Sequence, residues 1–144
     1  MNLPDVNVLV GALRPDAPAH ERCRAWLEAT VRDPRPFAVT SSVLSGVVRV
    51  LTHPRVFQPP SHTSAVLAEL DRLRSQPTAV PVEPGPRHWE LLRSLCEGAE
   101  ARGNLVPDAA LAAVAIEHGC TLVTLDRDFA RFEGLAWGPP DRPG

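Results

Sequence analysis

Apolar residues alternate along the chain between short continuous runs and longer helical faces. A short apolar run predicts a strand that is buried on both faces, as in a parallel sheet. Apolar residues spaced at i, i+3, i+4 and i+7 predict an amphipathic helix. The predicted strands are 1–5, 37–41, 78–84, 121–126 and 134–137. The predicted helices are a segment after Asp5 and the segments 19–31, 41–57, 61–75, 87–101 and 107–120.

This alternation of strands and helices predicts an α/β domain with a mainly parallel central sheet flanked by helices. Pro81 lacks a backbone N–H, so the strand that contains it is expected at an edge of the sheet. Gly119 marks the end of the helix that precedes it. Apolar side chains expected to face inward include those of Val66, Leu67, Leu70, Leu73 and Trp89.

The composition, 144 residues with 44% hydrophobic and 22% charged, is that of one globular domain. We assign it to residues 1–138, with a flexible tail at 139–144. No apolar run approaches the roughly 20 residues of a membrane span, and no secretory signal is evident. Cys23, Cys96 and Cys120 form no CxxC pair and are expected to be reduced core thiols. Together these features favour a cytoplasmic protein.

The charge pattern excludes several kinds of chemistry. The formal net charge is −2, and all fifteen basic residues are arginines. Receiver domains and haloacid-dehalogenase phosphatases need a lysine, so both are excluded. No glycine-rich phosphate loop and no G-x-S-x-G motif occurs. The five histidines lack zinc-ligand spacing with the cysteines and are assigned to the surface or to helix packing.

Four aspartates fall where predicted elements meet. Asp5 and Asp126 end strands, Asp128 follows in "DRDF", and Asp108 opens the last long helix. Structural roles are available, a helix cap for Asp108 and a turn for Asp126 and Asp128, but Asp5 interrupts an apolar run. Ligands bind beyond the carboxyl ends of parallel strands, where these side chains are expected to converge. Clustered carboxylates favour Mg²⁺ or Mn²⁺, and metal-assisted phosphodiester cleavage is the corresponding chemistry.

The helix over 41–57 is expected to be capped by the hydroxyl of Ser41 or Ser42, and it contains an unexplained glycine. Gly46 lies in its middle, where glycine costs roughly 1 kcal/mol relative to alanine. No turn, cap or kink accounts for it.

Four segments together resemble a PIN-domain ribonuclease, specifically a VapC-type toxin of a bacterial type II toxin–antitoxin system. They are "PDVNVLV", "VVRVLTHPRVF", "GNLVPDAALAAVAIEHG" and "TLVTLDRDFARFEGLAW". The resemblance implies a PIN-like fold for the expected α/β domain, with an acidic cluster that holds Mg²⁺ or Mn²⁺. It places the metal ligands at Asp5, Asp108 and Asp126, with Asp128 as an auxiliary member.

One expected ligand is missing. VapC-type chains usually carry a glutamate three residues before the arginine of the central helix, and here "GVVR" places Gly46 before Arg49. Either the position was changed to disable a toxic nuclease, or the chain is a natural member that binds without cleaving. A glycine codon in the native gene would exclude the first explanation. A glutamate is expected to suit this helix better than glycine does.

The resemblance implies an endoribonuclease that uses metal-activated water and leaves a 3′-hydroxyl and a 5′-phosphate. Arg49, Arg127 and Arg131 are candidate contacts to RNA, which is typically tRNA or rRNA for such toxins. A homodimer and a small VapB-type antitoxin are the implied partners. With Gly46 in place, cleavage by this chain is expected to be impaired. The alternative is a catalytically silent protein that binds its antitoxin or RNA.

Overall fold

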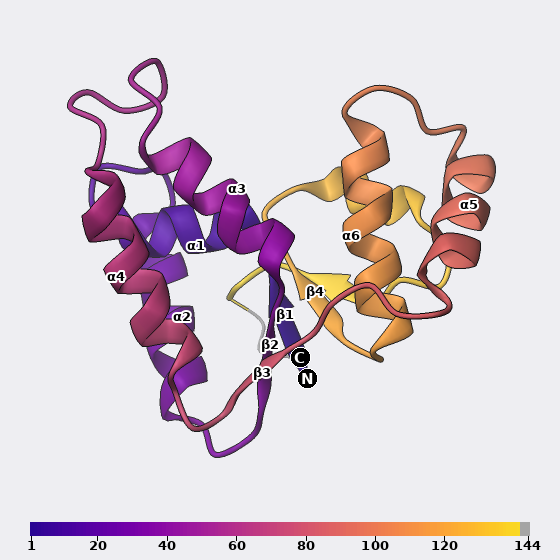
Figure 1. The fold of residues 1–144 in the computed structure, drawn as a ribbon, viewed down its shortest axis with the longest axis horizontal. Coiled ribbons are helices and arrows are strands. Elements are labelled where there is room, and N and C mark those ends of the chain that lie inside the picture. The colour runs from indigo at the N-terminus through magenta and orange to yellow at the C-terminus, as the bar shows by residue number, and fades with distance from the viewer. Residues whose placement is uncertain (142–144) are drawn as a thin grey trace.

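A five-stranded parallel sheet runs through the centre of the protein (Figure 1). The structure, a computed structural model, describes residues 1–141. The spatial order is β3-β2-β1-β4-β5, and every neighbouring pair is parallel. The predicted α/β class with a mainly parallel sheet is therefore confirmed. The strands are β1 (Asn2–Pro4), β2 (Phe37–Val39), β3 (Ala79–Pro81), β4 (Thr121–Val123) and β5 (Trp137–Gly138).

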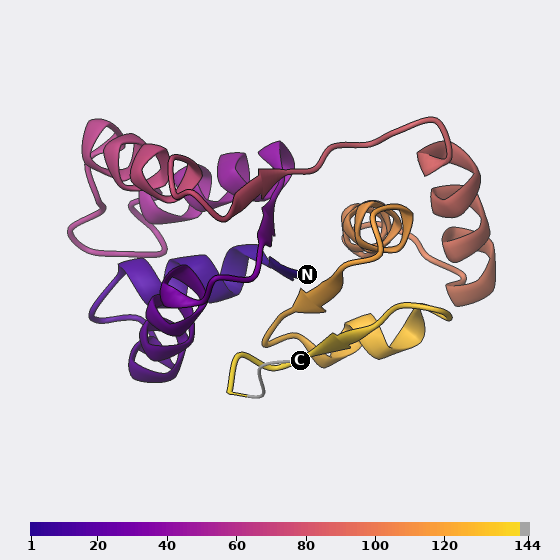
Figure 2. The ribbon, with the colours of Figure 1, turned by 90° about the horizontal axis from the view of Figure 1, so that it is seen from below.

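Helices α1 to α4 gather on one side of the strands, and α5 and α6 lie on the other (Figure 1 and Figure 2). The helices are α1 (Val6–Leu13), α2 (His20–Arg32), α3 (Ser41–Leu51), α4 (Thr63–Arg74), α5 (His88–Ala99) and α6 (Leu105–Glu117), followed by the short 3-10 helix η1 (Arg127–Arg131). No helix within residues 1–141 is long and apolar enough to cross a membrane.

The sheet order brings the candidate site together. β1 lies between β2 and β4, with Leu3 fully buried, while β3 is at an edge, as Pro81 predicts. Parallel strands present their carboxyl ends at one edge of the sheet. Asp5, after β1, and the segment that follows β4 therefore meet at that edge.

Two helix boundaries differ from the prediction. α3 ends at Leu51 rather than at residue 57, because Pro54 disfavours helical geometry in the residue before it. α6 begins at Leu105 rather than at Pro107. Pro107 is tolerated in the first turn, where the backbone N–H groups lack intrahelical partners.

The start of α3 is capped from outside the helix. Ser41 donates both its N–H (2.9 Å) and its hydroxyl (2.6 Å) to a carboxylate oxygen of Glu83, and the preceding Thr40 makes no side-chain cap. The predicted serine cap is therefore wrong, because a carboxylate from the segment after β3 accepts these hydrogen bonds instead.

Two predicted core residues are exposed. Leu67 is 48% exposed on the outer face of α4, and Trp89 is 67% exposed on α5. In α5 only Leu95 is buried, because this helix covers α6 from the outside (Figure 1). Of the predicted tail, Pro140 is buried, whereas residues 142–144 lie outside the described residues.

Candidate active site

Asp5 ties the end of β1 to the start of α1. Its Oδ1 accepts a 2.7 Å hydrogen bond from the N–H of Val6, which makes Asp5 the N-cap of α1. Its Oδ2 accepts from the hydroxyl of Thr124 at 2.7 Å and from the amide of Asn7 at 3.3 Å. Burial raises the pKa of Asp5; the hydrogen bonds from Thr124 and Val6 oppose that rise, and the charge of Asp126 adds to it.

Thr124 and Asn7 connect the acidic residues of two strands. The hydroxyl of Thr124 donates to Asp5 and accepts the N–H of Asp126 at 3.0 Å. The amide of Asn7 donates to the same hydroxyl at 3.3 Å, and its oxygen accepts the N–H of Leu125 at 3.1 Å. Neither residue was assigned a role from the sequence. The sequence does carry a signal for both residues: Asn7 is a polar residue inside the apolar run of "PDVNVLV", and Thr124 directly follows the apolar run of "TLV".

Asp126 and Asp128 follow β4 in a tight turn. Oδ1 of Asp126 accepts the N–H of Asp128 at 2.9 Å and caps η1. Asp126 is half-buried, whereas Asp128 is exposed. The turn role therefore applies to Asp126, and it fixes one carboxylate oxygen while the other makes no hydrogen bond within the described residues.

Asp108 lies in the first turn of α6 and does not cap the helix. The residue before the helix is Asn104, so the predicted cap role for Asp108 is wrong. The helix begins earlier than expected, which leaves the Asp108 carboxylate free of any capping hydrogen bond. Burial raises the pKa of Asp108 to about 6, and the charges of Asp5, Asp126 and Asp128 contribute to this rise. The charges of Asp5, Asp126 and Asp128 therefore act on Asp108.

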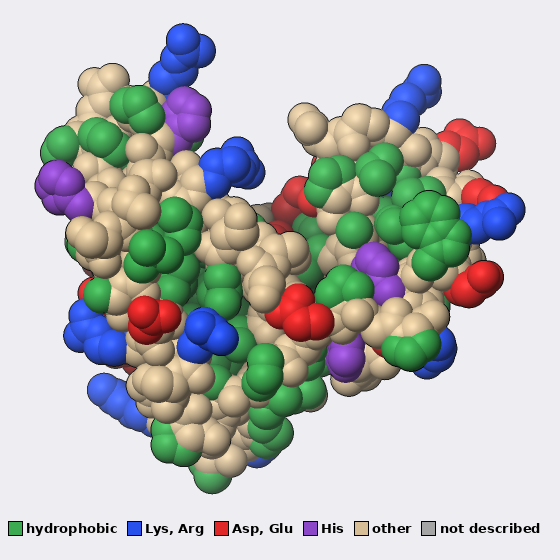
Figure 3. All heavy atoms as spheres, in the orientation of Figure 1, with side chains coloured by type: hydrophobic (Ala, Val, Ile, Leu, Met, Phe, Trp, Pro, Cys, Tyr) green, Lys and Arg blue, Asp and Glu red, His purple; other side chains and the backbone are tan. Residues whose placement is uncertain are grey.

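The aspartates have no basic partner. The ion pairs within residues 1–141 involve other acids and none of these four. Figure 3 shows acidic side chains in the hollow between the two lobes of the surface. Carboxylate oxygens gathered without a cation are the donor set that hard divalent ions prefer. However, no group of three His, Cys, Asp or Glu side chains in the described part of the chain is placed to hold a metal ion.

Gly46 lies where α3 approaches the start of α1. A Cβ atom at this position would come within 2.7 Å of Cγ2 of Val6, the residue after Asp5. The short, branched Val6 side chain would then have to move, at a cost in packing energy. This contact opposes the gain in helix propensity that a glutamate would bring, because a methyl group of Val6 occupies the space. The position still borders the acidic cluster through Val6.

The candidate RNA contacts differ from one another. Arg49 and Arg127 are exposed and make no ion pair within residues 1–141. Arg131 is also exposed, but its Nη2 donates a 3.1 Å hydrogen bond to the carbonyl of Ala99. Arg131 therefore links η1 to the end of α5.

Histidines and cysteines take structural positions. The rings of His20, His88 and His118 each hydrogen-bond a backbone carbonyl. The described cysteines are free thiols, as expected, with Cys23 and Cys120 buried and Cys96 half-buried. Burial raises the pKa of Cys23 and Cys120, so both thiols stay protonated and unreactive.

One cavity lies away from the four candidate aspartates. It has a volume of about 820 Å³ and is lined at the amino ends of the strands by Asn2, Phe37 and Thr121, and by Trp26 of α2.

Comparison with known proteins assigns the chain. A family model described as PIN domain matches residues 3–135, a span that contains all four aspartates. The chain belongs to the PIN-domain family. This PIN domain is 46% identical to ribonuclease VapC25 of Mycobacterium tuberculosis over 135 residues, 94% of this chain and 95% of that protein. It is 42% identical to VapC ribonuclease Mb2897 of Mycobacterium bovis over 136 residues, 94% and 92% of the two chains. The resemblance to VapC-type proteins is thus confirmed.

Solved structures share the fold of this PIN domain. VapBC2 from Rickettsia felis, bound to a promoter DNA fragment, superposes with a TM-score of 0.71 at 19% identity, covering 96% of this chain and 97% of that one. The sarcin-ricin loop cleaving toxin VapC20 of Mycobacterium tuberculosis gives a TM-score of 0.66 at 19% identity, covering 90% and 93%. At these identities the likeness establishes the fold alone.

Proposed function

We propose that this PIN domain is a metal-dependent endoribonuclease, the toxin of a toxin–antitoxin pair. The observation that carries the proposal is that Asp108 lies within electrostatic reach of Asp5, Asp126 and Asp128, and that no ion pair within residues 1–141 involves any of the four. The naming of its relatives as ribonucleases supports the same activity.

Asp5, Asp108 and Asp126 would hold Mg²⁺ or Mn²⁺, with Asp128 as an accessory ligand. Their oxygens fit these ions, and the mutual repulsion that raises the pKa of Asp108 would be relieved by a cation. A bound metal supplies a lowered pKa for water and stabilises negative charge on a phosphate. Because no three side chains in residues 1–141 form a ready site, water and RNA phosphate oxygens would complete the ligand set, as is common for Mg²⁺.

The chain's own residues orient this site. Thr124, Asn7 and the N–H of Val6 fix both oxygens of Asp5, and the N–H of Asp128 fixes one oxygen of Asp126. Asp108 carries a proton below about pH 6, so this proton must leave before its carboxylate binds a cation. Hydrogen bonds within the chain therefore orient Asp5 and Asp126, while the negative charge of Asp108 depends on pH.

Cleavage by the chain as written is proposed to be impaired. Gly46 supplies no carboxylate, and Val6 fills the space beside it. The test is cleavage of total tRNA and rRNA with Mg²⁺ or Mn²⁺ by the chain and by a Gly46→Glu/Val6→Ala variant, which has room for the longer side chain. A Gly46→Gln/Val6→Ala variant is the matched control, equal in size but uncharged.

We expect the glutamate variant to cleave much faster than the other two proteins, leaving products with 5′-phosphates. Strong metal-dependent cleavage by the unmodified chain would contradict the proposed impairment and support the proposed nuclease activity. No cleavage by any of the three would favour the second candidate, a silent PIN domain that binds antitoxin or RNA. Two observations motivate that second candidate. Gly46 supplies no carboxylate, and no three side chains in residues 1–141 form a ready metal site.

The proposed partners are a VapB-type antitoxin, an RNA substrate of the tRNA or rRNA class and a second copy of the chain. Structures of similar fold include VapBC complexes from Rickettsia felis and Salmonella typhimurium. Co-expression with the product of the neighbouring gene, followed by size-exclusion chromatography with light scattering, tests both protein contacts. Absence of a stable complex would count against the toxin assignment.

A further inference from the structure

Residues 52–62, which join α3 to α4, form a structured segment that we call the arm. The N–H of Ser61 donates a 2.8 Å hydrogen bond to the last carbonyl of α3 and closes its base. Within the arm, the carbonyl of His53 accepts the N–H of Phe57 at 3.2 Å, and Nδ1 of the His53 ring accepts the N–H of Arg55 at 3.1 Å. Figure 1 shows the arm extending beyond the outer end of α3.

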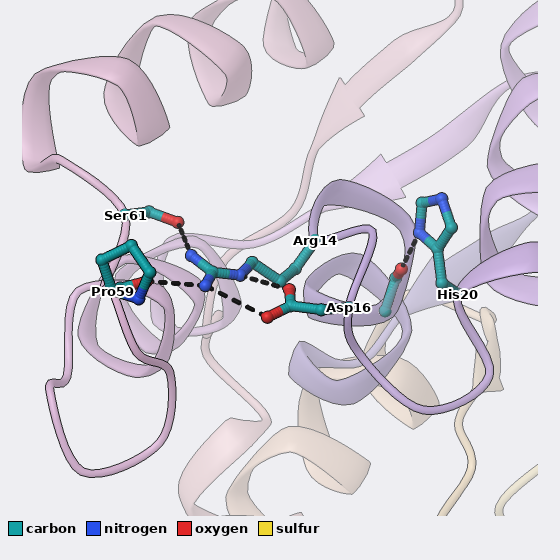
Figure 4. Close-up of polar contacts among 6 residues, drawn as sticks. Arg14, Asp16, His20, Pro59 and Ser61 are labelled. Atoms are coloured by element: carbon teal, nitrogen blue, oxygen red, sulfur yellow. Dashed lines mark hydrogen bonds and ion pairs between the residues drawn. The ribbon is translucent and has the colours of Figure 1, made fainter.

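Arg14, at the end of α1, fastens the arm (Figure 4). Its guanidinium donates to the carbonyl of Pro59 at 2.6 Å and to the hydroxyl of Ser61 at 3.0 Å. It also lies 4.5 Å from the ring centre of Phe57 and pairs with Asp16. The Arg14 side chain is only 13% exposed, and its hydrogen bonds divide between the arm, through Pro59 and Ser61, and the carboxylate of Asp16 in the segment after α1. The arm is therefore hydrogen-bonded to the end of α1, the helix whose N-cap is Asp5.

The arm presents an arginine without an acidic partner. Arg55 is exposed and makes no ion pair in the described residues, and the same is true of Arg49 on α3 and Arg102 between α5 and α6. Arg24 and Arg72, on α2 and α4, pair with acids on their own helices. Figure 3 shows basic side chains on the upper rims of both lobes, on either side of the hollow that contains acidic groups.

We propose that the arm is an RNA-binding element and that Arg14 is its positioning residue. Arg55 and Arg49 contact phosphates of the RNA strand on one side of the acidic hollow, and Arg102 contacts the strand on the other. The polyanion offsets unpaired guanidinium charge on both rims, while the carboxylates between them repel it and leave the central phosphate to a bound cation. This inference rests on the proposed ribonuclease function and adds where the substrate strand lies.

The test is fluorescence anisotropy with a labelled single-stranded RNA of about 20 nucleotides, in EDTA so that binding is measured without cleavage. Arg55→Ala is the main variant, and it should fold because the side chain is exposed and unpaired. Arg24→Ala, which also removes one exposed arginine, is the matched control. Arg14→Gln loosens the arm, and Arg14→Gln/Arg55→Ala completes a double-mutant cycle.

We expect Arg55→Ala to weaken RNA binding about threefold to tenfold and to lower the salt-dependence slope by about 0.7, whereas Arg24→Ala changes neither. Arg14→Gln should weaken binding in the unmodified chain but not in the Arg55→Ala background, a pattern that general destabilisation would not give. Equal affinities for Arg55→Ala and Arg24→Ala would overturn the proposal. A loss confined to antitoxin binding would also overturn it and assign the arm to protein contact. If RNA binding depends on Arg55 but no protein in the cleavage test cuts RNA, the proposed ribonuclease function is refuted and the RNA-binding role of the arm is supported.

Discussion

The hydroxyl of Thr124 donates a 2.7 Å hydrogen bond to the carboxylate of Asp5 across 119 positions of sequence. The same hydroxyl accepts the N–H of Asp126, so one oxygen atom sets the positions of two candidate metal ligands. The contact exists because β1 and β4 are neighbouring parallel strands that end at the same level. Thr124 is therefore part of the acidic site, although it carries no charge.

Replacing Thr124 by valine should weaken both the fold and the site. The buried Asp5 would lose a hydrogen bond that lowers its pKa, so that pKa should rise further. We expect a loss of about 1–2 kcal/mol in the free energy of unfolding, measured by urea denaturation, and weaker Mn²⁺ binding by calorimetry. Thr124→Ser keeps the hydroxyl and should behave like the unmodified chain. Equal Mn²⁺ affinity in the valine and serine variants would show that the hydroxyl does not orient the site.

Asp108 should make the metal-free protein less stable as pH rises. Its pKa of about 6 lies above the ordinary value of 3.8, so between these pH values the folded chain binds more protons than the unfolded chain. Stability from this group is complete below about pH 4 and is lost through pH 6. Asp108→Asn should therefore add about 1 kcal/mol at pH 8, after allowance for partial solvent screening, and nothing at pH 4.

Urea denaturation of both proteins in EDTA at the two pH values measures this effect. Added Mg²⁺ should stabilise the unmodified chain at pH 8 more than the asparagine variant, because the cation binds the ionised carboxylate. A stability difference that is the same at both pH values would mean that Asp108 is not under electrostatic strain.

Gly46→Ala should destabilise the protein, although alanine is the better helix former. The gain in helix propensity is about 1 kcal/mol, whereas the contact with Val6 at 2.7 Å introduces overpacking that typically costs about 1–3 kcal/mol. In a Val6→Ala background the clash is absent, and Gly46→Ala should then stabilise by about 1 kcal/mol. Thermal unfolding of the four proteins in this cycle decides the point. Stabilisation in both backgrounds would mean that the glycine has no packing role.

Arg131 and Arg127 should respond differently to alanine substitution. Arg131 donates to the carbonyl of Ala99, so its loss should lower stability by about 0.5–1 kcal/mol and leave RNA affinity unchanged. Arg127 is exposed and unpaired within residues 1–141, so its loss should weaken RNA binding without a change in stability. Thermal unfolding and RNA anisotropy in EDTA measure the two effects. If Arg131→Ala weakens RNA binding and Arg127→Ala lowers stability, the RNA-binding role belongs to Arg131 and the structural role to Arg127.

The order of elements was predictable because each strand and helix carries its own apolar spacing. The edge position of β3 followed from Pro81, and the end of α6 followed from Gly119, which has a φ of 65°. Local chemistry determines each of these features. Trp89 was misplaced because the periodicity of α5 does not show that this helix covers α6 from the outside (Figure 1), which leaves one of its faces exposed.

The acidic cluster was predictable in part. Strand ends and a family resemblance indicated the four aspartates, but the roles of Thr124 and Asn7 depend on strand adjacency, which no local pattern contains. The packing reason for Gly46 was equally hidden, because it requires contact between α3 and the first residue of α1. Arg14 likewise acts on a segment more than forty positions away.

Asp5 is both a candidate ligand and the N-cap of α1, and this dual use affects the choice of an inactive reference protein. Alanine at this position would remove the carboxylate and also uncap the helix, so lost activity and lost structure would be confounded. Asparagine is among the best capping residues, so its single side-chain oxygen can replace Oδ1 of Asp5 at the N–H of Val6, while its NH2 group faces the hydroxyl of Thr124, which then acts as the acceptor. Asp5→Asn is therefore the substitution that removes charge from the centre of the site while leaving the first turn of the domain in place.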